Sequence, residues 1–147
     1  MADELTVNVT SLVPAPPERA FEALTEPGQI AQWWGPAGFI CPEVSFEPRA
    51  GGAYRIAMQP PDGELFHLGG EIVEFEPPER LAYTFAWEPP DPDDRENVAR
   101  LSLAERGDST EVAVIHGPFA TEARRDLHRA GWTDTLARLT AFLQRPA

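Results

Sequence analysis

Residues 121–143, TEARRDLHRAGWTDTLARLTAFL, form the stretch that decides the fold class. Its largest side chains recur every three or four residues, so they share one face of a predicted helix; they are His128, Trp132, Leu136, Leu139 and Leu143. Thr121 is suited to cap the start of this helix, and Glu122 is favourably placed in the first turn. Gly131 costs such a helix about 1 kcal/mol relative to alanine, which predicts a close contact with a neighbouring strand.

Two short helices and a first strand are predicted at the other end of the chain. Leu5–Val13 alternates apolar and polar residues, which is typical of a half-buried strand. Pro17 can begin a helix, because the first helical residue needs no N–H, and Phe21 gives that helix an apolar face. Ile30–Trp34 predicts a second helical turn, ended by the Gly-Pro pair that follows it.

The middle of the chain predicts strands separated by turn residues. Their ranges are Val44–Phe46, Tyr54–Met58, Leu65–Glu76, Leu81–Trp87, Val98–Glu105 and Thr110–His116. Gly69 and Gly70 stand inside one of these strands, where they predict a bulge or a sharp bend. Leu81–Trp87 is the clearest strand, with its large residues on one face. The acidic, proline-rich segment Glu88–Asp94 predicts a mobile, solvated loop.

This order predicts a single α+β domain over residues 1–147, in which a curved antiparallel sheet wraps around the long terminal helix. A helix about 10 Å in diameter cannot fill the inner face of such a sheet, which leaves either a closed core of side chains or an apolar cavity. The residues predicted to line that space are Trp33, Trp34, Tyr54, Ile56, Met58, Tyr83, Phe85, Trp87, Val114, His116, Trp132 and Leu136.

Composition narrows the classes of partner. The 147 residues carry 24 acidic and 12 basic side chains, a net charge of -12, which disfavours nucleic acid and anionic membranes as partners.

The N-terminus lacks a signal-peptide pattern, and no apolar run reaches the roughly 20 residues of a membrane span. A cytoplasmic location is therefore expected. No metal site and no cofactor are predicted, because Cys41 stands alone, the histidines lack ligand spacing, and the glycine pairs lack nucleotide-loop patterns.

Several short motifs carry a family resemblance that covers nearly the whole chain. They are Ala23-Leu24-Thr25, Trp33-Trp34-Gly35-Pro36, Gly51-Gly52, Tyr54-Arg55, Pro77-Pro78-Glu79-Arg80-Leu81 and Gly131-Trp132 with Leu136 and Leu139. In this order they resemble the SRPBCC (START-like) superfamily, in the branch named for the activator of the heat-shock protein 90 ATPase. The resemblance implies a helix-grip fold of about seven strands with a deep hydrophobic cavity. Fold alone does not imply function.

Three functions stay open at this stage. The first is non-catalytic binding of a small hydrophobic or aromatic molecule. The second is an enzyme of the cyclase, aromatase or hydrolase type, with His116 as acid or base and Tyr54 or Tyr83 orienting the substrate; the alternative for His116 is a buried, hydrogen-bonded structural residue. The third is a stress-related role beside a chaperone, which the branch name alone suggests. Homodimerisation is a further possibility if Trp33, Trp34 and Phe39 form an exposed apolar patch.

Overall fold

The computed structural model describes residues 5–145 and confirms the α+β helix-grip architecture. Its helices are α1 (Pro17–Thr25), α2 (Pro27–Trp33) and α3 (Glu122–Leu143). Its strands are β1 (Leu5–Val13), β2 (Val44–Phe46), β3 (Ala53–Met58), β4 (Phe66–Glu76), β5 (Arg80–Thr84), β6 (Ala86–Glu88), β7 (Val98–Arg106) and β8 (Ser109–Phe119). They form one antiparallel, 8-stranded sheet in the order β1-β8-β7-β5-β4-β3-β2, with β6 paired to β4.

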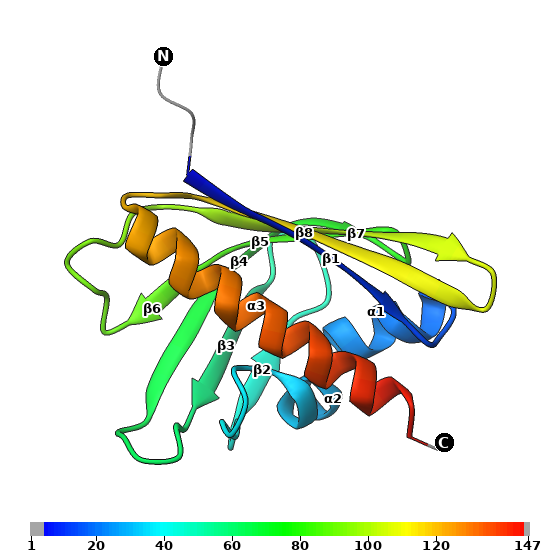
Figure 1. Cartoon of the computed structure of the whole chain (residues 1–147), viewed down its shortest axis with the longest axis horizontal. Helices are drawn as coiled ribbons and strands as arrows, with labels where there is room; N and C mark the ends of the chain where they lie inside the picture. The colour runs from blue at the N-terminus through cyan, green and yellow to red at the C-terminus, as the bar shows by residue number, and fades with distance from the viewer. Residues whose placement is uncertain (1–4, 146–147) are drawn as a thin grey trace.

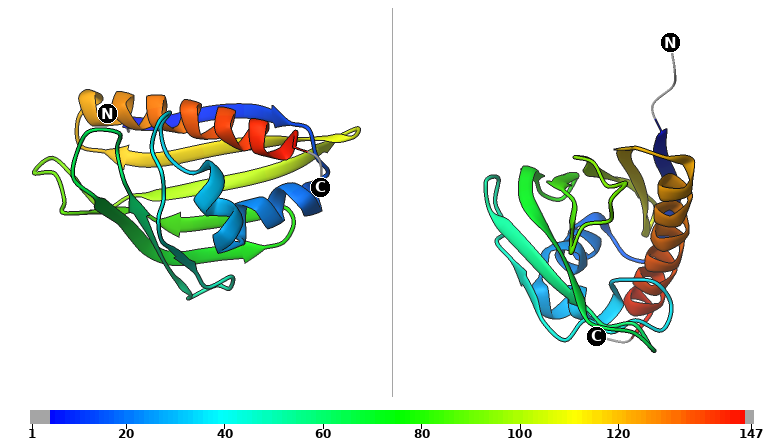
Figure 2. Two further views of the ribbon diagram at one scale, coloured as in Figure 1. Left: turned by 90° about the horizontal axis from the view of Figure 1, so that it is seen from below. Right: turned by 90° about the vertical axis from the view of Figure 1, so that its left-hand side faces the viewer.

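The long helix lies across the open side of the curved sheet (Figure 1). Helices α1 and α2 lie inside the curve, near the C-terminal half of α3, as the two turned views show (Figure 2). The Thr121 hydroxyl accepts a hydrogen bond from the Arg124 N–H at 3.1 Å, so the predicted cap is confirmed. Because α1 and α2 lie near the other half of α3, its N-terminal half faces the sheet without a helix beneath it (Figure 2). None of the helices among residues 5–145 has the length and apolar character needed to span a membrane.

The sheet bends at β4. The first half of this strand pairs with β3 and β6, and its second half pairs with β5. A Cβ atom at Gly70 would lie 2.2 Å from the carbonyl oxygen of Thr84, so only glycine permits this close approach. The single strand expected over Leu81–Trp87 is wrong, because opposite Gly70 it divides at Phe85 into β5 and β6. This division accounts for eight strands instead of about seven.

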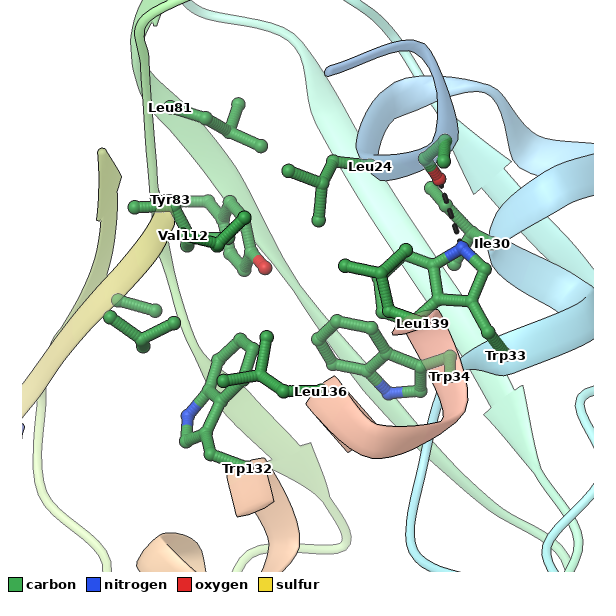
Figure 3. Packing of buried hydrophobic residues seen from close by; sticks show 14 of the residues in the cluster. Leu24, Ile30, Trp33, Trp34, Leu81, Tyr83, Val112, Trp132, Leu136 and Leu139 are labelled. Atoms are coloured by element: carbon green, nitrogen blue, oxygen red, sulfur yellow. Dashed lines mark hydrogen bonds between the residues drawn. The ribbon is translucent and has the colours of Figure 1, made fainter. Parts of the chain in front are cut away.

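The apolar stripe of α3 packs against the short helices and the inner face of the sheet. Figure 3 shows this packing around Leu24, Ile30, Trp33, Trp34, Leu81, Tyr83, Val112, Trp132, Leu136 and Leu139. The Trp33 indole N–H donates to the Ala23 carbonyl at 3.0 Å. Trp33 and Trp34 are 1% and 6% exposed, so of the two alternatives left open by the sequence, an exposed patch or the core, these two residues belong to the core. Helix α2 begins at Pro27, one turn earlier than expected.

Arg138 holds the chain where it leaves α2. Its Nη1 donates toward the carbonyl oxygens of Trp34, Gly35 and Pro36 at 2.8, 3.1 and 3.1 Å. We expect Arg138→Met to lower the free energy of unfolding by about 1–3 kcal/mol, because it leaves partly buried carbonyl groups without their charged donor. Urea denaturation of this variant against Arg129→Met, a change on the exposed side of the same helix, provides the measurement. Equal losses in the two variants would contradict a specific role for Arg138.

Candidate ligand cavity

A cavity of about 630 Å³ lies between the N-terminal half of α3 and the bent part of the sheet. Small-molecule sites in proteins usually measure about 300–1,000 Å³. Its walls come from the segment after α2, the end of β3, the start of β4, the region around β6 and the loop that follows it. No residue of α1 or α2 lines this cavity, and the two helices lie beside the other, C-terminal half of α3 (Figure 2).

Six aromatic side chains line the walls; they are Trp34, Phe39, Phe66, Phe85, Trp87 and Trp132. They also support one another. The ring centroids of Trp34 and Trp132 lie 5.5 Å apart in an edge-to-face arrangement, and those of Phe85 and Trp87 lie 5.3 Å apart. Edge-to-face pairs at such distances are favourable beyond the area that they bury. The walls are thus a mutually packed aromatic surface, suited to an apolar or aromatic guest.

Two hydrogen-bonded pairs of tryptophan and histidine involve residues of these walls, Trp132 and Trp87. The Trp132 indole N–H donates to His116 Nδ1 at 3.0 Å, and His116 Nε2 lies 2.7 Å from Asn97 Oδ1. The Trp87 indole N–H donates to His128 Nε2 at 2.9 Å, and His128 Nδ1 lies 2.7 Å from the Arg124 carbonyl. Since an indole can only donate, each imidazole is neutral and carries its proton on the other nitrogen. Neither indole N–H is left unpaired toward a ligand.

Burial favours the same neutral state. Desolvation, with a smaller contribution from the nearby His128, lowers the pKa of His116 to about 3. Desolvation also lowers the pKa of His128, although its hydrogen bond to the Arg124 carbonyl and the charge of Asp94 act in the opposite direction. Both histidines therefore act as fixed hydrogen-bond acceptors for tryptophan near neutral pH.

Charged side chains are confined to the rim, where they come from Glu64, Asp91, Asp94 and Arg124. The Arg124 Nη2 donates to Asp94 at 2.7 Å, and its Nη1 lies 3.8 Å from Asp91. Asp91 and Asp94 belong to the proline-rich segment that was expected to be a mobile, solvated loop. That interpretation is incomplete, because this ion pair attaches the segment to α3 and its prolines line the cavity.

The structure divides the predicted lining residues into two groups. Trp34, Met58, Phe85, Trp87 and Trp132 line the cavity. The others lie in the packed core outside its lining; they are Trp33, Tyr54, Ile56, Tyr83, Val114, His116 and Leu136. The two groups differ in the position of each residue along its strand. Alternation identifies the residues on the inner face of the sheet, but it does not identify the end of the strand that the short helices leave uncovered.

The groups assigned to chemistry in the sequence fall in the second group. His116 is fully buried, with its ring centroid 4.4 Å from that of Phe85, and both ring nitrogens have partners. The Tyr54 hydroxyl donates to the Thr84 carbonyl at 2.6 Å, and burial raises the pKa of Tyr54 and of Tyr83. His116 and Tyr54 are thus hydrogen-bonded within the core, and Tyr83 is buried beside Tyr54.

Sequence reasoning missed part of the lining, chiefly Phe39, Leu65, Phe66, Leu127 and Gly131. The helical residues carried a usable signal. His128 lies one turn before Trp132, Gly131 one turn before Thr135 and Leu127 one turn before Gly131, so all of them share one side of α3. The close contact expected at Gly131 is wrong. A Cβ atom there would meet nothing within 4 Å, because this position faces the cavity.

Gly131→Ala is accordingly expected to stabilise the protein by about 0.5–1 kcal/mol, since alanine restores helix propensity without a steric clash. Thermal or urea unfolding checks this value. A destabilised Gly131→Ala variant would mean that a neighbouring segment occupies the space beside this residue.

A curved sheet around a terminal helix, with an apolar cavity where the two diverge, defines a ligand-binding helix-grip fold of the SRPBCC type. The chain belongs to the family described as Activator of Hsp90 ATPase homolog 1-like protein, whose model matches residues 14–144. The resemblance seen in the sequence is thereby confirmed.

Solved structures of similar proteins support this assignment. Protein CV1439 from Chromobacterium violaceum is 26% identical, with a TM-score of 0.85 over 96% of this chain and 98% of that one. The AHSA1 protein SPO3351 from Silicibacter pomeroyi is 24% identical, with a TM-score of 0.81 over 94% and 96% of the two chains. DynU16, a protein described from the dynemicin biosynthetic locus, is 26% identical with a TM-score of 0.75 over 97% of this chain and 48% of its own. A search of curated proteins found no match.

Proposed function

We propose that the protein binds a small hydrophobic or aromatic molecule in the cavity between α3 and the bend of the sheet. The observation that supports the proposal is the aromatic wall around about 630 Å³. A guest of this kind would remove both its own apolar surface and that of the wall from water, at about 25 cal/mol for each Å². The hydrogen bonds of the two indole–imidazole pairs stay intact when the guest binds. A cytoplasmic location stays a prediction from the sequence.

A thermal-shift screen of small aromatic compounds and lipids tests the proposal, because a ligand that binds only the folded state raises the melting temperature. At a concentration one hundred times its dissociation constant, a true ligand adds about 2.7 kcal/mol of stability. We expect hits among rigid two- and three-ring aromatics. A screen without a hit at millimolar concentrations would count against ligand binding.

Turnover of a bound molecule is a second candidate, favoured by the similarity to DynU16 and its biosynthetic locus. His128 is then the histidine to test, because it lines the cavity whereas His116 does not. Unchanged turnover of an identified substrate by His128→Gln would remove this candidate.

The chaperone-related role predicted from the branch name stays a prediction, which a pull-down without any chaperone would refute.

A further inference from the structure

The rim of the cavity carries an excess of negative charge. Three carboxylates, Glu64, Asp91 and Asp94, line the opening beside one cationic side chain, Arg124. Asp94 is bound to Arg124 at 2.7 Å, and Asp91 lies within 3.8 Å of the same guanidinium group. The hydrogen bond that His128 accepts from Trp87 requires a neutral imidazole, so the fifth titratable group at the cavity adds no positive charge.

An anionic head group would meet unfavourable conditions at this rim. It would have to displace Asp94 from Arg124 or lie against the remaining carboxylates, and the chain as a whole carries a net charge of -12. A positively charged head group meets the opposite conditions. The carboxylates attract it from solution, and the aromatic side chains immediately inside the rim favour a cation through their ring quadrupoles.

Resting on the proposed function, we infer that the cavity prefers an organic cation: a molecule with an aromatic or apolar body inside the aromatic wall and a protonated amine between Glu64 and Asp91. Burial of the body provides affinity, and the charge of the amine provides selectivity among ligands of equal size. Glu64 comes from the turn before β4 and Asp91 from the loop after β6, so the two acidic residues that line the cavity belong to different segments of the chain.

Three naphthalene probes of nearly equal size test the inference by isothermal titration calorimetry at low salt: 2-(1-naphthyl)ethylamine, 2-(1-naphthyl)ethanol and 1-naphthylacetate. We expect the protonated amine to bind about tenfold or more tightly than the carboxylate, with the alcohol between them. Raising the ionic strength from about 0.01 M to about 1 M shortens the screening length from about 30 Å to about 3 Å, so the difference should shrink strongly.

Variants separate the rim from the overall charge. Glu64→Gln combined with Asp91→Asn should abolish most of the preference for the amine and leave binding of the alcohol unchanged. The control combines Glu79→Gln with Glu105→Gln, two exposed positions outside the cavity lining that change the net charge equally; it should keep the preference.

The outcomes distinguish this inference from the proposed function. Equal binding of the three probes, or tightest binding of the carboxylate, would overturn the preference for a cation and leave the proposal of an apolar ligand site standing. Loss of the preference in the control variant as well as in the rim variant would also overturn it. If none of the three probes binds, the proposed function fails and the inference fails with it.

Discussion

Acidification from pH 7.5 to pH 5 is expected to lower the free energy of unfolding by about 2 kcal/mol through His116 alone. In the folded protein its pKa is lowered to about 3 by burial, against an ordinary value of 6.5. Between these two values the unfolded chain binds the extra proton and the folded chain does not. The stability associated with His116 is therefore complete above pH 6.5, falls with decreasing pH and levels off near pH 3. His128 acts in the same direction.

Urea denaturation across this pH range, with two variants, isolates the effect. His116→Leu should be less stable at pH 7.5, because the indole N–H of Trp132 and the amide of Asn97 lose their partner, but its stability should fall less steeply toward pH 5. His67→Gln changes a partly exposed histidine of β4 and should retain the slope of the natural protein. A natural protein and a His116→Leu variant with the same pH profile would contradict the buried, neutral state of His116.

Gly131→Trp is expected to weaken ligand binding by about a hundredfold or more. The added indole would start from a position with no neighbour within 4 Å and extend into the cavity, where it would occupy the space of the guest. Because helical side chains lean toward the N-terminus of their helix, it would lie along the turn that carries Leu127 and His128. Calorimetric titration with a ligand found in the thermal screen gives the ratio of dissociation constants.

Ala130→Trp is the matched control for this change, because it adds the same side chain one residue away, on the exposed surface of α3. It should bind the ligand as the natural protein does. Both variants should unfold cooperatively with melting temperatures close to that of the natural protein. Undiminished binding by Gly131→Trp would mean that the ligand occupies another part of the molecule.

Periodicity was sufficient to predict the architecture. The spacing of Trp132, Leu136 and Leu139 predicts α3, and two-residue alternation predicts most of the strands, because burial of one face is a property of each element by itself. The division of Leu81–Trp87 at Phe85 depends instead on the approach of Thr84 to Gly70 across the sheet. A contact between distant segments of this kind leaves no mark on the period of either strand.

The candidate site was predictable only in part, for a related reason. Tyr83 and Phe85 have the same phase in the sequence, yet Tyr83 is enclosed by the core and Phe85 lines the cavity. Tyr83 packs against Phe46 and Tyr54, whereas Phe85 lies beside Trp34 and Trp132. The contributions of the proline-rich loop and of Gly131 could not be foreseen either. The polarity of the loop predicts that it is exposed to solvent, and the low helix propensity of glycine predicts close packing at Gly131.

X-ray diffraction from crystals soaked with 1-bromonaphthalene tests the central claim most directly, because bromine gives an anomalous signal that locates the guest without interpretation of weak density. We predict one strong peak inside the aromatic wall, between Phe66, Phe85 and Trp132. A cavity filled by the protein's own side chains, with no bromine between α3 and the sheet, would contradict it.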